Sequence, residues 1–116
     1  MTVSGPARDW VSVWVGDFTE ELALDGYLGP AFRRDHGCVA HENSAYGVHT
    51  AAMPLGQLLA EHAIYALWGR QILAVAASQG VSAASCSLVY LHYRHVPAHQ
   101  APGPLRFVGS VQMARG

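Results

Sequence analysis

Residues 10–16 read Trp-Val-Ser-Val-Trp-Val-Gly, a run of β-branched and aromatic side chains that is typical of a strand. Successive side chains of a strand point to opposite faces, so the valines share one face and the tryptophans the other: Val11, Val13 and Val15 against Trp10 and Trp14. Both faces are largely apolar. The pattern therefore predicts a strand in the interior of a sheet, closed by the turn residues Gly16-Asp17.

A short helix is predicted next. Thr19 is placed to cap it through its side-chain oxygen, with two glutamates in the first turn, and we expect it to run to about Leu28. Gly29-Pro30 is a typical end. Helical spacing assigns one set of residues to the sheet side (Leu24, Tyr27 and Leu28) and another to the solvent side (Glu21 and Asp25).

The middle of the chain has a weaker pattern. Residues 31–50 suggest only short strands, near 38–42 and 46–50, with a turn at Asn43-Ser44. Pro54 can start a helix whose Leu55, Leu58, Leu59 and His62 recur at helical spacing. An apolar helix over residues 64–78 follows, after a break near His62 or Gly69, and Gly80 ends it.

Two further strands are predicted at the C-terminal end, over residues 85–94 and 105–113. Residues 97–104 hold three prolines and a glycine, and must form a loop. The simplest pairing is an antiparallel hairpin between these two strands. The order of elements predicts one α+β domain over residues 10–116, mainly antiparallel sheet with two or three helices packed on it, after an N-terminal tail at residues 1–9.

Composition agrees with a single packed core. The chain has 116 residues, 51% of them apolar and 13% charged, which excludes a disordered binder. Its most apolar stretch, residues 63–77, is interrupted by polar residues and is shorter than a membrane span requires. No leader peptide is visible, so we expect a cytoplasmic protein that does not enter membranes.

Charge is distributed unevenly along the chain. Residues 1–42 hold seven acidic and three basic residues, a net charge of −4, whereas residues 43–116 hold one acidic and four basic residues, a net charge of +3. The acidic half predicts a docking surface for a basic partner, although a solvated helix face gives the same pattern. A total charge of −1 and scattered arginines disfavour nucleic-acid binding.

Seven histidines and two cysteines raise the question of a metal site. His92 and His95 would point to opposite faces of a strand, so with His99 they do not converge on one ion unless the strand ends between them. Cys38 and His41, with Cys86 or His36 brought near by folding, form no paired zinc-ligand spacing. We therefore predict no metal and no cofactor, and we expect Cys38 and Cys86 to be buried thiols.

No catalytic motif emerges either. Neither cysteine, nor Ser78 or Ser85, lies in a recognisable nucleophile signature. The neighbouring carboxylates Glu20 and Glu21 point in different directions, and no glycine-rich phosphate loop is present. We expect a binding protein without catalytic residues. Its carboxylates would gather along one rim of the sheet: Asp17, Glu20, Glu21 and Asp25, followed in the chain by Asp35 and Glu42.

Three segments resemble the immunity protein 22 family of bacterial polymorphic toxin systems. The run from Trp10 to Phe18 and the acidic helix after it resemble the N-terminal signature of that family. Residues 87–93 and 105–110 resemble its closing strands, and residues 32–38 a central segment. This chain departs from the family after residue 38, where Glu42 is the one carboxylate in a region that is more acidic in the family.

The resemblance implies an α+β protein that binds and neutralises a cognate toxin domain, often a nuclease, without performing a reaction. It implies partner-binding roles for Trp14, Asp17, Glu20, Glu21 and Asp35, with a core role for Trp14 as the alternative. Two other functions stay open on the sequence alone. One is a small metal-binding or enzymatic protein, and the other is a regulatory or scaffold subunit that forms homodimers; the sequence leaves open whether the chain is a monomer or a homodimer.

Overall fold

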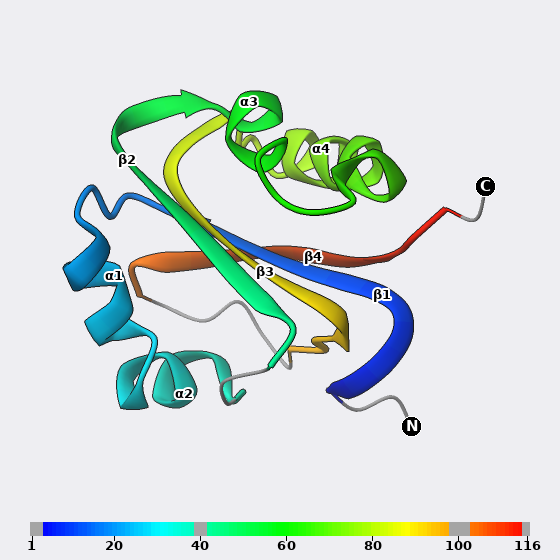
Figure 1. Cartoon of the computed structure of the whole chain (residues 1–116), viewed down its shortest axis with the longest axis horizontal. Coiled ribbons are helices and arrows are strands. Elements are labelled where there is room, and N and C mark those ends of the chain that lie inside the picture. The colour runs from blue at the N-terminus through cyan, green and yellow to red at the C-terminus, as the bar shows by residue number, and fades with distance from the viewer. Residues whose placement is uncertain (1–3, 39–41, 98–102, 115–116) are drawn as a thin grey trace.

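The computed structural model describes residues 4–38, 42–97 and 103–114. A four-stranded antiparallel sheet lies at its centre, with two pairs of helices on opposite faces (Figure 1). The α+β fold class is confirmed. The strands are β1 (Gly5–Gly16), β2 (Ser44–Pro54), β3 (Ala83–Arg94) and β4 (Leu105–Gln112). The helices are α1 (Glu21–Tyr27), α2 (Pro30–His36), α3 (Leu55–Leu59) and α4 (Gly69–Ser78), with a short 3-10 helix, η1 (Tyr65–Leu67), before α4.

The strand order is β2-β3-β1-β4, so β1 lies in the interior as predicted. Its Trp14 is paired with Leu88 of β3 on one side and Phe107 of β4 on the other. The predicted hairpin between the last two strands is wrong, because β4 pairs with β1 and not with β3. An interior strand needs a neighbour along each edge, and the long connection between β3 and β4 lets β4 cross to the free edge of β1.

The alternation along β1 builds two separate cores. Val11, Val13 and Val15 pack with the leucines of α3 and with Trp68 and Ile72 around α4. Trp14 packs on the opposite face in a cluster of aromatic and apolar side chains: Leu24, Tyr27, Phe32, Tyr90 and Phe107. We call the first the aliphatic face and the second the aromatic face. The prediction that both faces of this strand are buried is confirmed.

Several boundaries differ from the prediction. β1 begins at Gly5, so residues 5–9 belong to the sheet and do not form a tail. The segment has a bulge between Pro6 and Val11, with Asp9 at a φ of 67°. The bulge interrupts the alternation of side chains from which the strand was predicted, so residues 5–9 were not assigned to it. The helix α1 begins at Glu21, and Glu20 takes the N-cap position without a side-chain cap, which corrects the predicted cap at Thr19.

The helix α2 was not predicted. Pro30 was interpreted as the end of the preceding helix, but it occupies the first turn of a new one, where a missing N–H costs nothing. Gly37, at a φ of 72°, ends α2 in the left-handed conformation that glycine adopts readily. The sequence also suggested a strand near 38–42, but Cys38 and Glu42 lie outside regular strands, and residues 39–41 lie outside the described part of the chain.

None of the helices in the described residues is long and apolar enough to cross a membrane.

Candidate partner-binding surface

Trp14, which the sequence offered as a partner-binding residue, has no exposed surface. Its ring lies 5.3 Å from that of Phe32, 5.0 Å from Tyr90 and 5.1 Å from Phe107, measured between centroids. A side chain enclosed in this way cannot touch a partner. Of the two roles considered for Trp14, the structure supports the core role.

Asp35 is also engaged inside the molecule. Its Oδ2 accepts a hydrogen bond of 2.7 Å from the Tyr27 hydroxyl, and its Oδ1 accepts one of 3.1 Å from Arg34 Nε. The bond from Tyr27 lowers the pKa of the Asp35 carboxyl below its ordinary value. Because Tyr27 belongs to α1 and Asp35 to α2, this carboxylate ties the two helices together and is not available as a docking group.

Asp17 and Glu20 are exposed, and neither is joined to another residue by an ion pair in the described part of the chain. Asp17 follows the end of β1 and lines a hollow together with Arg106 of β4. Glu20 lies at the N-cap of α1. The acidic residues of the N-terminal half therefore do not all gather on one rim.

Glu21 and Asp25 lie one turn apart on the exposed side of α1, next to β2. The contact is made through Tyr46, whose hydroxyl donates to Glu21 Oε1 at 3.4 Å. Partial desolvation of the hydroxyl, together with the charges of Asp25 and Glu21, raises the pKa of Tyr46. The two carboxylates thus lie against β2 on the aromatic face of the sheet, the face to which Tyr46 contributes.

Glu61 lies beside β2 from the opposite side. Its two carboxylate oxygens lie 3.0 and 2.9 Å from Nε2 of His49, near the middle of β2. The carboxylate also occupies the space where a side chain at Gly47 would be, since a Cβ built there would collide with Glu61 Oε1. Glycine at position 47 is what lets Glu61 approach the strand so closely.

Glu42 completes this arrangement at the start of β2. It is exposed in the turn that precedes the strand and lines a hollow with Asn43, Ser44 and His62. Ion pairs in the described part of the chain join Arg34 to Asp35 and His49 to Glu61, so no arginine there neutralises Glu21, Asp25 or Glu42. Glu21, Asp25 and Glu42 therefore keep their negative charge without an arginine partner in the described residues, whereas Glu61 lies against His49.

An exposed apolar side chain lies next to these carboxylates. Leu22 of α1 is 84% exposed, the highest value among the large hydrophobic residues described. On α1, Leu22 follows Glu21 directly and precedes Asp25 by three residues, so an apolar side chain is exposed next to two carboxylates, as at the boundary between the apolar core and the polar rim of a contact site. We call the combined area the acidic β2 surface: Glu21, Leu22, Asp25, Glu42, Tyr46, His49 and Glu61.

Sequence reasoning found three of these residues, Glu21, Asp25 and Glu42, and missed the rest. Glu61 comes from a separate part of the chain, where it is the one carboxylate of a basic half. No local pattern places Glu61 at the same strand as Glu21. The packing of α3 on β2 brings the turn after α3, which holds Glu61, to the strand that α1 also contacts. Only Leu22 could have been found from the sequence, because its position on α1 lies outside the apolar side formed by Leu24, Tyr27 and Leu28.

The histidine and cysteine groups considered from the sequence do not assemble a site in the described residues. His92 is exposed, whereas His95 is buried against Trp14, with ring centroids 5.3 Å apart. Cys38 and Cys86 are free and buried, as predicted, and burial raises the pKa of Cys38 to about 12. No group of three metal-ligating side chains occurs in the described ranges, which leave out His41 and His99.

One serine and histidine pair does have the spacing of a catalytic dyad. His62 Nε2 lies 2.7 Å from Ser87 Oγ, and burial lowers the pKa of His62, which favours the neutral imidazole. Ser87, however, has no exposed surface and lies within β3 between β1 and β2. Its hydroxyl cannot reach a substrate in this conformation, so the pair joins the segment after α3 to the sheet.

Comparison with models of known families, with curated proteins and with solved structures finds no match to this chain.

Proposed function

We propose that this protein is an immunity protein, which binds a cognate toxin domain through the acidic β2 surface and blocks the toxin without catalysis. The observation that carries the proposal is the convergence of Glu21, Asp25, Glu42 and Glu61 on one strand, with Leu22 exposed beside them. Complementary charge accelerates association and orients the partner, whereas a buried apolar anchor supplies much of the affinity.

The partner that fits this surface is basic. Nucleases that bind the phosphate backbone carry clusters of arginine and lysine, and an acidic surface can occupy the same groups. The resemblance to the immunity protein 22 family points to the same class of partner. Occlusion of the toxin would then require no chemistry from the immunity protein itself.

Co-expression with the toxin domain encoded by the gene next to its own tests the proposal. We expect rescue of growth and a complex that survives purification. A toxin that remains lethal and forms no complex with this chain would contradict the proposal.

A pair of matched double variants tests the surface. Glu21→Gln with Asp25→Asn removes two charges from the acidic β2 surface, and Asp17→Asn with Glu20→Gln removes two exposed charges elsewhere. Since exposed ion pairs contribute up to about 1 kcal/mol each, the first variant should weaken the complex about three- to tenfold, mainly through slower association. The second should bind nearly as tightly as the natural chain. Equal effects would place the contact elsewhere.

A further inference from the structure

The sheet has two outer strands, β2 and β4, and they differ in how their free edges are protected. An edge strand presents unpaired N–H and C=O groups that can pair with another chain. Proteins block such edges with bulges, charged side chains, prolines or covering helices. Comparing these devices on the two strands indicates which edge is open.

The β4 edge is covered. Val108 is the extra residue of a bulge opposite β1, and its carbonyl accepts a hydrogen bond of 2.7 Å from Gln79 Nε2 at the end of α4. Arg106 Nε donates to Gln79 Oε1 at 3.2 Å and places a charge on the same edge. Beyond the strand, Ala114 N donates to the carbonyl of Leu67 at 2.8 Å. Side chains and the segment before α4 therefore occupy this edge.

The β2 edge lacks this cover along its first half. Residues 44–48 pair with β3 on one side, and in the described part of the chain no backbone hydrogen bond outside the sheet involves them. β2 contains no lysine, arginine, aspartate or glutamate. Its proline, Pro54, and its bulge, between Val48 and Met53, both lie in the second half. Figure 1 shows β2 as the outermost strand on the side opposite β4.

The carboxylates lie above and below this open edge. Tyr46 points to the aromatic face, where Glu21 and Asp25 lie, whereas Gly47 and His49 face Glu61 on the other side of the sheet. A strand added along residues 44–48 would alternate its side chains between these two faces. Basic residues at neighbouring positions of such a strand would each meet a carboxylate.

We infer that β2 binds an extended, basic segment of a partner protein as a fifth strand of the sheet. The inference rests on the proposed function and specifies its geometry: the toxin would contribute a strand with lysine or arginine on both of its faces. A second copy of this chain fits less well. Antiparallel pairing of two β2 strands would bring Glu21, Asp25 and Glu61 of both copies together, and like charges across a strand pair are unfavourable.

A synthetic probe tests the inference without the toxin. The probe is a nine-residue peptide of alternating threonine and valine with two lysines on each face, titrated into the full chain labelled with ¹⁵N. We expect chemical-shift changes, and at least about fivefold slower amide exchange, confined to β2 around residues 44–48. A control peptide has the same side chains, but its backbone nitrogens are methylated so that neither edge can donate a hydrogen bond. It should bind at least about tenfold more weakly, because it keeps the charge but cannot form a strand pair with β2.

Two proline variants provide a test on the side of the protein. Successive N–H groups of a strand point to opposite edges, so of Ser44→Pro and Ala45→Pro one removes a bond to β3 and the other removes an outward donor. Thermal unfolding identifies which variant has lost the bond to β3 and which has lost the outward donor. The variant with unchanged stability should lose peptide binding.

Three results would overturn the inference: equal binding of the N-methylated peptide, protection that falls on β4 instead of β2, or slow exchange of residues 44–48 in a dimer without peptide. The outcome is separable from that of the growth assay. If the chain rescues cells but its β2 amides show no protection by the peptide, the toxin-binding function stands and strand addition fails. If the peptide binds but no growth is rescued, the open edge stands and the immunity function fails.

Discussion

The face of the sheet beneath α3 and α4 is filled mainly by valines and leucines, whereas the face beneath α1 and α2 is filled by aromatic rings and buried histidines. Both faces are built from the same strands, and β1 contributes its valines to one and Trp14 to the other. The aliphatic face gains stability mainly from apolar burial, which does not depend on pH, although the half-buried His62 also lies on it. The aromatic face adds hydrogen bonds and titratable groups, so its stability should depend on particular atoms and on proton concentration.

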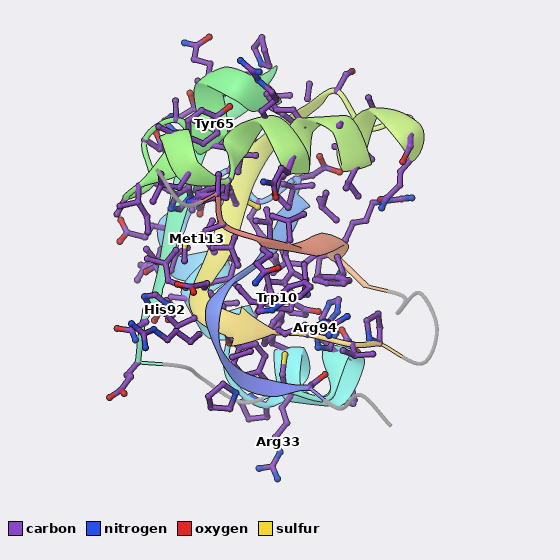
Figure 2. The ribbon with its side chains drawn as sticks, turned by 90° about the vertical axis from the view of Figure 1, so that its right-hand side faces the viewer. Trp10, Arg33, Tyr65, His92, Arg94 and Met113 are labelled. Atoms are coloured by element: carbon purple, nitrogen blue, oxygen red, sulfur yellow. The ribbon has the colours of Figure 1, made fainter. Side chains whose placement is uncertain are left out.

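Two tryptophans of β1 test how strongly the aromatic face depends on its centre. Trp14 has no exposed surface, packs against the rings of two histidines as well as the three rings given above, and donates its indole N–H to Nδ1 of His36 at 3.3 Å. Trp10 is half-buried and packs under Arg94, whose Cζ lies 4.1 Å from the ring centroid; Figure 2 shows the two side chains next to each other. We expect Trp14→Ala to lower the free energy of unfolding by about 3–5 kcal/mol, as burial of a large aromatic side chain predicts.

Trp10→Ala is the matched control, because it makes the same change in the same strand. It should cost about 1 kcal/mol, the size of a partly exposed cation–π contact. Urea denaturation measures both values. Similar costs at the two positions would mean that the aromatic face does not depend on Trp14 as its centre.

The second difference expected between the two faces is how much stability each loses at low pH. His95 is buried between Trp14 and Phe107, and its Nε2 has no hydrogen-bond partner in the described residues. Burial, together with the nearby His36, lowers the pKa of His95 to about 4. Burial also lowers the pKa of His36, with Asp35 opposing the shift, and that of the half-buried His62 on the aliphatic face. Burial therefore favours the neutral form of all three imidazoles in the folded state at neutral pH.

The sign of the pH effect follows from these shifts. A histidine whose folded pKa lies below its unfolded value of about 6.5 takes up its proton more readily when unfolded. Its stabilising contribution is complete above pH 6.5 and falls as the pH approaches the folded value. For His95 alone, a folded pKa near 4 predicts a loss of about 2 kcal/mol between pH 8 and pH 5. Urea denaturation at the two pH values measures this loss.

His95→Asn should remove most of the pH dependence, even if it lowers the stability at pH 8. His49→Gln is the control, since His49 lies at the surface beside Glu61. It should leave the difference between pH 8 and pH 5 nearly unchanged. A difference that survives in His95→Asn would assign the acid sensitivity to His36 or His62.

Some of this contrast could be predicted from the sequence. The alternation of valine and tryptophan correctly placed β1 inside the sheet with both faces buried, because a period of two is a local property of a strand. The neighbours of β1 were not predictable in the same way. Pairing of β4 with β1 depends on where a long connection leads, and the sequence pattern of β4 suits either neighbour.

In the candidate surface, too, the residues set by a local pattern were predicted and those set by contacts between distant segments were not. The acidic side of α1 follows from helical spacing, so Glu21 and Asp25 were found. Asp35 was included with them because it follows these carboxylates along the chain and lies in the segment, residues 32–38, that resembles the central part of the immunity protein 22 family. Its bond to Tyr27 depends on α2 folding back against α1, and α2 was not predicted. Glu61 was missed because β2 brings together residues about forty positions apart, which no local pattern records.

The smallest difference we expect lies within the aromatic face, between two tyrosines that both donate to carboxylates. Tyr27 is buried and its bond to Asp35 is 2.7 Å, whereas Tyr46 is half-buried and its bond to Glu21 is 3.4 Å. A short bond to a charged acceptor contributes about 1.5–3 kcal/mol. Since Arg34 still bonds the other carboxylate oxygen of Asp35, Tyr27→Phe should cost about 1.5–2 kcal/mol, the lower part of that range.

Tyr46→Phe should cost less than about 0.5 kcal/mol, because a long bond near solvent exchanges with water at little cost. It should still affect binding, since removing the hydroxyl frees Glu21 at the acidic β2 surface. Thermal unfolding of both variants, with complex formation measured in parallel, checks the two expectations. A Tyr46→Phe variant that loses as much stability as Tyr27→Phe would show that contacts with β2 contribute as much to the packing of α1 as its bond to α2 does. The acidic β2 surface would then stabilise the fold in addition to serving as the proposed contact site.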